Sequence, residues 1–368
     1  MALSKKFCLV TVVESIAITS MPLNEFVLYK CQFSQTYRQI LIVCSKELTC
    51  EDLLPSQVEV KLVGRNVKQM RSYLHEIVQS CKDNHESLVV HLHAPRSAFF
   101  FHMSSIGMNL RKKTVFTVHS TYKGRNLKYR FFSSLIALLS NYVVCVSHAA
   151  LNGYSPIIKA IKGKRMIVIL NGVDIDRINS VIPNSEVLFP NLKKMICVGR
   201  LIPIKNQQFL IRLLPSLPEM ELILVGQGQD DAFLKDLSNQ LHVANRVKFC
   251  GLLRRENVFK ILSECGIYVS ASKVEGLPIS VLEAMAVGVY PIISMIPSHM
   301  DISAVCDNVT ILPLDSSIWI RAINRFLQTT SEERENISVG LKSDARRNFS
   351  LEKMHQSYNQ IYELLAEQ

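Results

Sequence analysis

The sequence has little of what marks several large classes of protein. No apolar run approaches the roughly 20 residues of a membrane-spanning helix, and the basic start, Met1 to Lys6, leads straight into a short strand-like run. We therefore expect a soluble protein without a cleaved signal. The ten cysteines are scattered and form no C-x-x-C pair, which is typical of reduced thiols in a cytosolic core.

Motifs of several enzyme classes are also missing. The chain has no G-x-x-x-x-G-K-[ST] phosphate loop and no G-x-S-x-G nucleophile elbow, which argues against nucleotide and ester hydrolysis. Asp174-Ile-Asp176 spells a D-x-D, but it continues an Asn-Gly-Val-Asp loop, and the pair His91-x-His93 lacks a third ligand at convincing spacing. We expect neither a metal nor another cofactor.

Acidic residues are absent from one long segment. Residues 87–173 contain twelve Lys or Arg and no Asp or Glu. Residues 1–180 carry 23 basic against 11 acidic side chains, while residues 181–368 carry 19 against 20. Such a field attracts phosphates or an anionic membrane surface, although a solvated basic face without a partner is the alternative. Aromatic residues are sparsely interleaved and no nucleic-acid module is recognisable, so a nucleic-acid-binding protein is the less favoured interpretation.

Hydrophobic patterning indicates two α/β domains, and 368 residues with 48% hydrophobic content suffice for two cores. Strand-like runs alternate with helix-length amphipathic segments, which predicts parallel, doubly wound sheets. The expected strands are Phe7–Val13, Gln39–Val43, Ser87–His93, Thr114–His119, Tyr142–Ser147 and Met166–Asn171, then Met195–Val198, Glu221–Val225, Val247–Cys250, Gly266–Ser270, Pro291–Ser294 and Val309–Leu312.

A polar, turn-forming stretch over residues 173–193 separates the two series of strands. We expect an N-terminal domain over residues 1–180 and a C-terminal domain over residues 181–345. Apolar residues at helical spacing behind Ser350 predict a closing helix. The tail, residues 346–368, is expected to pack back towards the N-terminal domain.

Two acids flank the start of a predicted helix. The stretch from Val269 reads strand, polar loop, then a helix opened by Pro278, with Glu275 in the loop and Glu283 more than a turn inside the helix. Free backbone N–H groups near the helix start suit a diphosphate. Two glutamates eight residues apart are a weak pattern alone, and the loop-then-helix context strengthens it.

Two cations follow the first strand of the C-terminal half. In Val198-Gly199-Arg200-Leu-Ile-Pro-Ile-Lys205-Asn206, Gly199 allows close backbone approach and Arg200 can fork onto phosphate oxygens. Lys205 supplies a compact charge just before the next helix. Both would stabilise a departing phosphate.

These residues resemble those of the retaining glycosyltransferases of family 4, which have the GT-B architecture of two facing Rossmann-like domains. The resemblance implies that the N-terminal domain, residues 1–180, binds the acceptor and that the C-terminal domain, residues 181–345, binds the nucleotide sugar. The G-R-L-x-x-x-K-N segment of that family appears as Gly199 to Asn206, and its E-x7-E motif as Glu275 to Glu283. Val225-Gly226-Gln-Gly228 and the run from Val247 to Leu252 are similar to segments near the nucleotide and its base.

The resemblance implies a role for each matching residue. Arg200 and Lys205 would bind the nucleotide diphosphate, Glu275 would contact the transferred sugar, and Glu283 would hold the ribose hydroxyls. The remaining donor-binding positions would be Gly199, Gly276, Leu277, Pro278 and Ile279. In the N-terminal half, Thr117-Val118-His119-Ser120 resembles the segment with the active-site histidine of the family, so His119 would orient the donor sugar. Asn171 to Asp174 and Val146 to Ala149 match loops that are mainly architectural.

One segment departs from the family. Many relatives carry a glycine-rich loop after the first strand, but here residues 14–22 read Glu-Ser-Ile-Ala-Ile-Thr-Ser-Met-Pro. Without glycines the backbone cannot approach a ligand as freely. We assign this loop no site residue.

The resemblance implies a metal-independent, retaining hexosyltransferase that uses a nucleotide sugar, a UDP-sugar being the commonest donor. The acceptor would be a lipid-diphosphate-linked saccharide in bacterial O-antigen or capsule synthesis, reached from the cytoplasmic face of the inner membrane, where the protein would bind peripherally to anionic lipid. The departing phosphate would take the proton of the attacking hydroxyl. The alternative within enzymes is an epimerase or hydrolase that acts on the nucleotide sugar itself.

Overall fold

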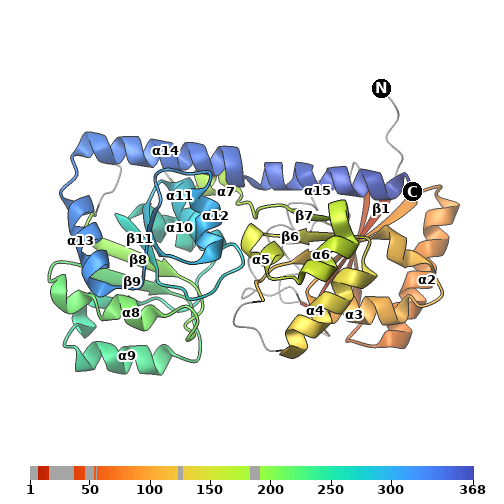
Figure 1. The fold of residues 1–368 in the computed structure, drawn as a ribbon, viewed down its shortest axis with the longest axis horizontal. Helices are drawn as coiled ribbons and strands as arrows, with labels where there is room; N and C mark the ends of the chain where they lie inside the picture. The colour runs from red at the N-terminus through yellow and green to blue at the C-terminus, as the bar shows by residue number, and fades with distance from the viewer. Residues whose placement is uncertain (1–6, 16–36, 46–53, 55, 123–126, 183–190) are drawn as a thin grey trace. The chain divides into compact units, whose positions relative to one another are not determined.

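The structure, a computed structural model, describes residues 7–15, 37–45, 54, 56–122, 127–182 and 191–368. These residues form two compact units, one of residues 1–171 with 351–368 and one of residues 172–350. Each is a Rossmann-like α/β domain built on a parallel sheet, which confirms the expected fold class (Figure 1). Most of the glycine-poor loop, the cations Lys123 and Arg125, and the stretch 183–190 lie outside the described residues.

The first unit has a seven-stranded sheet in the order β3-β2-β1-β4-β5-β6-β7. Its strands are β1 (Phe7–Val13), β2 (Arg38–Val43), β3 (Glu59–Leu62), β4 (Ser87–His93), β5 (Thr114–Val118), β6 (Tyr142–Cys145) and β7 (Met166–Val168). Its helices are α2 (Val67–Asp83), α3 (Pro95–Ser104), α4 (Leu127–Leu139), α5 (His148–Asn152), α6 (Pro156–Lys162) and α15 (Leu351–Ala366), with 3-10 turns at Leu110–Lys113 and Gly163–Arg165.

Alternate residues along the central strands β1, β4, β5 and β6 pack into two separate cores, because side chains of a strand point to opposite faces in turn. Val10 packs in the cluster that contains buried residues of α2 and α3, while its neighbour Leu9 packs in the cluster with α15. Tyr358 and Tyr362 bring α15 onto that second face, along which the helix runs in Figure 1. The C-terminal helix is therefore part of the first unit.

The second unit has a six-stranded sheet in the order β10-β9-β8-β11-β12-β13. Its strands are β8 (Lys194–Val198), β9 (Glu221–Val225), β10 (Val247–Phe249), β11 (Ile267–Ser270), β12 (Tyr290–Ser294) and β13 (Thr310–Leu312). Its helices are α7 (Ile175–Val181), α8 (Gln207–Ile211), α9 (Asp231–Gln240), α10 (Arg255–Ser263), α11 (Ile279–Val287), α12 (Pro297–Ser303), α13 (Ser316–Leu327) and α14 (Ser331–Phe349), with 3-10 turns at Leu214–Ser216 and Ala244–Arg246.

The two compact units meet a few residues away from the expected domain boundaries. The first lies between residues 171 and 172 rather than 180 and 181. Helix α7 belongs to the second unit because it packs on α10 and α11, and Arg177 pairs with Glu256 of α10. The second lies between residues 350 and 351 rather than 345 and 346, since residues 346–349 complete α14.

Candidate functional site

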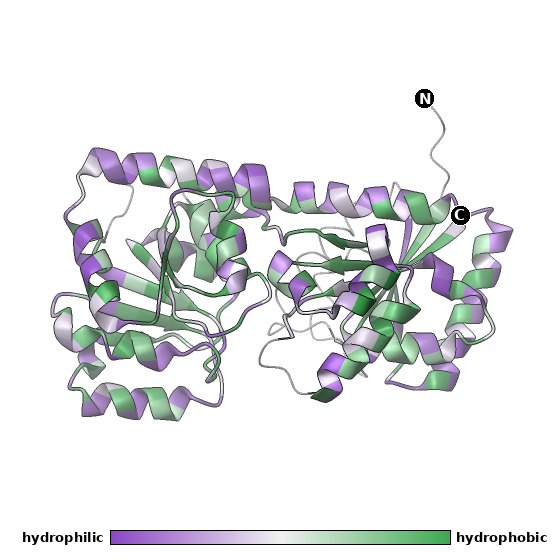
Figure 2. Ribbon diagram, in the orientation of Figure 1, coloured by the Kyte–Doolittle hydropathy of each residue, from purple (hydrophilic) through white to green (hydrophobic). Residues whose placement is uncertain are grey.

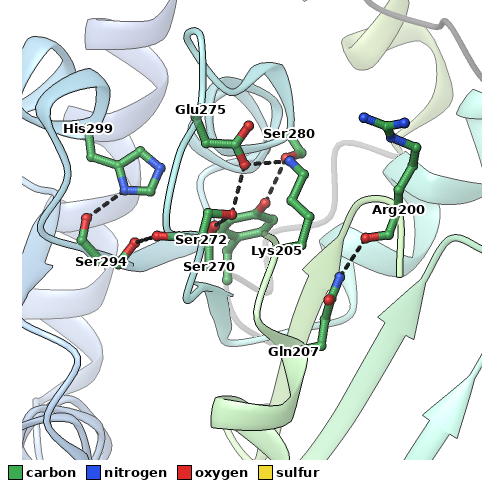
Figure 3. A network of polar contacts seen from close by, with 10 residues as sticks. Arg200, Lys205, Gln207, Ser270, Ser272, Glu275, Ser280, Ser294 and His299 are labelled. Atoms are coloured by element: carbon green, nitrogen blue, oxygen red, sulfur yellow. Dashed lines mark hydrogen bonds and ion pairs between the residues drawn. The ribbon is translucent and has the colours of Figure 1, made fainter. Parts of the chain in front are cut away.

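The ends of two neighbouring strands bring together the cation and the acid that the sequence singles out. Strands β8 and β11 pair in parallel, so the loops that follow them leave the same edge of the sheet. Lys205, in the loop after β8, donates through Nζ to Oε1 of Glu275, in the loop after β11 (Figure 3). Their side chains are 20% and 12% exposed. The pair is therefore largely enclosed but reachable from solvent.

A second donor fixes the carboxylate of Glu275. Ser272 Oγ lies 2.7 Å from Glu275 Oε1 and donates to it. Burial raises the pKa of Glu275, but the charge of Lys205 and the hydrogen bonds from Lys205 and Ser272 outweigh that effect, so the pKa is lowered and the group is ionised at neutral pH. Oε1 receives both bonds, and the structure gives Oε2 no hydrogen bond within the described residues.

Backbone hydrogen bonds join the loops after β8, β9 and β10 into one support. Gly199 N donates to Val225 O at 2.9 Å, and Gly226 N donates to Gly251 O at 2.8 Å. A Cβ on Gly226 would lie 2.1 Å from Gly199 O, and one on Gly228 would lie 2.0 Å from Leu201 O. Only glycine allows this close approach, so the loop that carries Lys205 is held in place by its neighbours.

The N-terminus of α11 lies beside Glu275 and is built from backbone alone. Pro278 is the N-cap, and no side chain caps the helix. The side chains of Leu277, Pro278 and Ile279 are buried, which leaves the main chain as the polar part of this turn. Helix N-termini with free N–H groups favour anions such as phosphate. Gly276 precedes the turn and is half-buried.

Glu283 is further from solvent than the sequence suggests. It lies in the middle of α11, where its side chain is 1% exposed and both carboxylate oxygens are buried. Arg255, at the start of α10, forms an ion pair with it and is itself 8% exposed. A ribose could reach this carboxylate only if it became accessible, so a ribose contact by Glu283 stays a prediction.

Gly199 and Arg200 lie at the sheet edge as expected. Gly199 has φ +158°, and a Cβ there would make ordinary contact with the Lys205 side chain at 3.6 Å. Arg200 is exposed, and its carbonyl accepts a hydrogen bond from Gln207 Nε2 at 2.9 Å. In Figure 3 its guanidinium and the Lys205 ammonium extend to the same side of the loop. Both cations can thus reach an anion outside that edge.

His119 belongs to the other unit, at the end of β5. Its Nε2 lies 2.9 Å from Nδ1 of His93, which ends β4. His91, two residues earlier, lies in the core, with Tyr362 Oη at 2.6 Å and Thr117 Oγ1 at 2.7 Å. The rings of His91 and His93 lie against each other, with centroids 3.9 Å apart, and His93 is in turn hydrogen-bonded to His119. A contact of His119 with a donor sugar stays a prediction.

Two groups of residues are of the types that bind metal ions. Asp174 of the D-x-D is the N-cap of α7, with its Oδ1 2.9 Å from Arg177 N. Elsewhere in the described residues, Cys8, Cys81 and Glu86 place one ligand atom each within 4.8 Å of one another. Arg38 donates to Glu86 Oε2 at 2.9 Å and to Cys81 Sγ at 3.4 Å, so a positive charge already neutralises this group.

Several residues around Glu275 carry no signal in the sequence. Ser272 and Ser294 are ordinary serines after strands, and His299 and Arg255 match none of the motifs considered. Ser272, Ser294 and His299 are no more than 1% exposed, and hydrogen bonds join them into one group. The two serines and His299 lie at, or within five residues of, the ends of strands that reach this edge. That shared position is the one signal in the sequence that could have indicated them.

Two family models match the chain. Residues 180–340 match "Glycosyl transferases group 1" and residues 54–177 match "Glycosyltransferase Family 4". The second unit, with Lys205 and Glu275, thus corresponds to the first of these models, and most of the described part of the first unit corresponds to the other.

Individual proteins are also similar to the chain, at identities below 30% for the three described next. An uncharacterized glycosyltransferase of Methanocaldococcus jannaschii is 28% identical over 48% of this chain and 46% of its own. The GPI3 subunit of phosphatidylinositol N-acetylglucosaminyltransferase from Saccharomyces cerevisiae is 26% identical over 68% of this chain and 59% of its own. The crystal structure of HepE from Anabaena in complex with UDP and glucose has a TM-score of 0.73 at 17% identity, over 97% of this chain and 99% of that one.

These matches differ in extent. The chain spans less than half the length of the first curated relatives it matches, whereas the structural match to HepE extends over almost the whole of both chains and shows the fold. Within the residues that the structure describes, no helix combines the length and the apolarity needed to cross a bilayer.

Proposed function

We propose, from a chain that carries a family 4 and a group 1 glycosyltransferase domain, that this protein is a retaining, metal-independent glycosyltransferase. It moves a hexosyl or N-acetylhexosaminyl group from a UDP-sugar to a lipid-diphosphate-linked saccharide. The product is an intermediate of bacterial surface polysaccharide, O-antigen or capsule.

The contact between Lys205 and Glu275 is the observation that carries this proposal. In the structure the two charges neutralise each other. A nucleotide sugar offers a better partner to each, since its diphosphate attracts the ammonium and its sugar hydroxyls donate to the carboxylate. The donor therefore replaces one internal ion pair by two contacts that point at the bond to be broken.

The groups around this pair suit the chemistry of the leaving phosphate. When the bond from the anomeric carbon to the diphosphate breaks, negative charge grows on phosphate oxygens while the sugar ring becomes cationic. Lys205, Arg200 and the uncapped N-terminus of α11 offer positive charge or dipoles without a metal. In a retaining reaction by front-face attack, the departing phosphate itself takes the proton of the acceptor hydroxyl.

A surface on the first unit supports a lipid-linked acceptor. Helices α4 and α6 pack together and expose apolar side chains, with Leu127 79%, Phe131 66%, Ile157 72% and Ile161 64% exposed. Lys128 and Arg130 stand among them, and Figure 2 shows green and purple segments together on α4. We call these six residues the α4–α6 surface. Apolar side chains among cations suit the interface of an anionic bilayer.

The names of similar proteins agree with these substrate classes. HepE binds UDP in its crystal structure, which supports a UDP-sugar as donor. The yeast relative acts with phosphatidylinositol, a membrane lipid, as its name states. A cytoplasmic, peripheral location at the inner membrane follows if the acceptor is lipid-linked.

The test is transfer from a panel of UDP-, GDP- and dTDP-sugars to a synthetic GlcNAc- or GalNAc-diphospho-lipid. We expect product from one donor, with the anomeric configuration of the donor retained by NMR and the rate unchanged by EDTA. Lys205→Met and Glu275→Gln should each lose the activity. The matched control is Lys273→Met, because Lys273 is an exposed lysine of the Glu275 loop with no predicted ligand.

Other outcomes would contradict the proposal in distinct ways. Conversion of a nucleotide sugar in the absence of any acceptor would favour the epimerase or hydrolase. Inversion of configuration would reject the retaining mechanism, and loss of activity with EDTA that added Mg²⁺ restores would reject metal independence. Equal activity of Lys205→Met and Lys273→Met would reject the site.

A further inference from the structure

His299 is a fully buried histidine beside Glu275 to which the proposed chemistry gives no role. It lies on α12 with 0% exposure, and its Nδ1 is 2.6 Å from the carbonyl oxygen of Ser294. A carbonyl only accepts, so Nδ1 carries the proton and Nε2 of the neutral ring is an acceptor. Within the described residues Nε2 has no hydrogen-bond partner. A buried polar atom without a partner is unfavourable, so its retention asks for an explanation.

Three hydrogen bonds, linked through the covalent atoms of Ser294 and Ser272, connect His299 to Glu275. Ser294, which receives the bond from His299, donates through its own Oγ to Ser272 O at 2.5 Å. Ser272 then donates through Oγ to Glu275 Oε1 at 2.7 Å. Figure 3 shows this chain running from the imidazole to the carboxylate and on to Lys205.

This series of hydrogen bonds decides which oxygen of Glu275 is left for a ligand. Ser272 is held at two points, its carbonyl by Ser294 and its hydroxyl by Glu275. This fixes the rotation of the carboxylate with Oε1 turned inward and leaves Oε2 for a sugar hydroxyl. The imidazole lies near enough for its charge to affect the pKa of Glu275. Burial lowers the pKa of His299 to about 4, which keeps the ring neutral near pH 7, so it does not compete with Lys205 for the carboxylate.

We propose that His299 is a positioning residue that, through Ser294 and Ser272, sets the orientation of Glu275 for the donor sugar. It acts on recognition and transfer of the sugar, and the nucleotide does not depend on it. The inference rests on the proposed function, because it takes Glu275 to be the group that meets the sugar.

The experiment compares two substitutions at one position. In His299→Asn the new amide N–H lies near the position of Nδ1 and can still donate to Ser294, whereas in His299→Leu the new side chain fills the space but donates nothing. We expect His299→Leu to lower kcat/KM for transfer about tenfold, the effect of one lost hydrogen bond. UDP affinity and Tm should change little, and His299→Asn should recover most of the loss.

Ser272→Ala and Ser294→Ala break the same chain without touching the imidazole. If the residues act in series, His299→Leu added to Ser272→Ala should lower transfer no further than Ser272→Ala alone. Ser294→Ala also keeps the proposal testable if His299→Leu does not fold. Fully additive losses, or equal losses of UDP and UDP-sugar affinity, would overturn the proposal, as would a failure of His299→Asn to recover activity.

The affinity gained by the sugar separates this inference from the proposed function. Calorimetry compares UDP with the UDP-sugar and needs no acceptor. If wild-type protein binds the UDP-sugar more tightly than UDP, and the advantage persists in His299→Leu and Ser294→Ala, the role of His299 is wrong while the donor site stands. If wild-type protein binds no nucleotide sugar, the proposed function fails first.

Discussion

The two units have the same kind of parallel sheet but differ in the charged side chains at its carboxyl edge. In the second unit, Lys205 and Glu275 meet at that edge and neutralise each other. In the first unit the same edge ends in the paired imidazoles of His93 and His119, and cations such as Lys128 stand out in solvent.

This difference matches the two kinds of ligand expected. A donor diphosphate needs a positive charge at one fixed point, so the charge is held by a carboxylate and by hydrogen-bonded loops until a ligand arrives. A membrane surface is broad and fluid, so solvent-exposed cations and apolar side chains spread over α4 and α6 suffice. Under the proposed function, the arrangement of charge, more than the fold, would separate donor binding from membrane binding.

The largest expected effect is at the ordered site. Lys205→Met and Glu275→Gln should each lower kcat/KM for transfer by about 10²–10³, the effect of losing one preorganised charged group. The control Lys273→Met should stay within about twofold of wild type, because a solvated lysine contributes little. Steady-state kinetics with the donor found in the panel measures all three. A small loss in Glu275→Gln would mean that the two units do not differ as described.

The second prediction concerns the glycines that support the Lys205 loop. Gly228→Ala would place a Cβ against the backbone oxygen of Leu201, and we expect a loss of about 3 kcal/mol in the free energy of unfolding from overpacking. In the first unit, Gly107 has φ +85° and open space around it, so Gly107→Ala should cost only about 1 kcal/mol of backbone strain.

Denaturant unfolding measures both glycine variants. UDP affinity should fall in Gly228→Ala and stay constant in Gly107→Ala, since of these two glycines Gly228 alone supports the site. Equal stability losses, or unchanged UDP affinity in Gly228→Ala, would show that the loop does not need this support.

The third prediction compares one buried histidine in each unit. The pKa of His102 is lowered to about 4 by burial and by repulsion from Arg111 and Lys162, and that of His299 to about 4 by burial against the opposing bond to Ser294. Both are neutral in the folded protein, so protonation favours unfolding. The free energy of unfolding should have its full value above about pH 6.5 and decrease towards pH 4, by up to about 1.4 kcal/mol per pH unit for each histidine.

Salt distinguishes the two histidines. High salt screens the exposed cation Arg111, so it should reduce the contribution of His102 to the pH dependence of the free energy of unfolding. The lowering of the pKa of His299 by burial is insensitive to salt, so its contribution should stay the same. The measurement is urea unfolding of wild type, His102→Asn and His299→Asn between pH 4 and 7 at two ionic strengths. Identical pH slopes in all three proteins would contradict the assignment.

The smallest expected effect is at the α4–α6 surface, where many weak contacts share the work. Lys128→Gln should weaken binding to liposomes that contain phosphatidylglycerol by about fivefold, the worth of one cation near an anionic surface. Phe131→Ser should weaken it by a similar factor. Phe233→Ser is the matched control, because Phe233 of α9 is 49% exposed on the other unit. Equal binding of Phe131→Ser and Phe233→Ser in sedimentation assays would show that α4 does not contact lipid.

Much of the fold could be predicted because buried parallel strands are continuous apolar runs that hydrophobic pattern detects. Phe7–Val13, Ser87–His93 and Glu221–Val225 agree with the structure residue for residue, and the other runs differ only at their ends. Hydrophobic pattern does not predict strand β3, Glu59–Leu62, because this strand lies at the edge of the sheet. Its four residues are at most half-buried, and two of them are charged. The sequence predicts a polar, turn-forming stretch where helix α7 lies, because the packing of α7 on α10 and α11, which places it in the second unit, leaves no mark in composition.

The site could be predicted only where a motif exists. Lys205 and Glu275 are 70 residues apart in sequence, and the family pattern alone suggested that they act together. The burial of Glu283 against Arg255 could not be read from the spacing of two glutamates, since it depends on α10 packing beside α11. The serines and His299 were missed because single hydrogen bonds between distant loops leave no periodic trace.

The affinity of Glu275→Gln for UDP, measured by calorimetry beside wild type and Lys205→Met, tests the central claim most directly. If Lys205 waits in an ion pair that the donor replaces, removing the charge of Glu275 frees the ammonium. UDP should then bind Glu275→Gln at least as tightly as wild type, and up to about tenfold tighter, while Lys205→Met binds it more weakly. A fall in UDP affinity in Glu275→Gln as large as that in Lys205→Met would contradict the account.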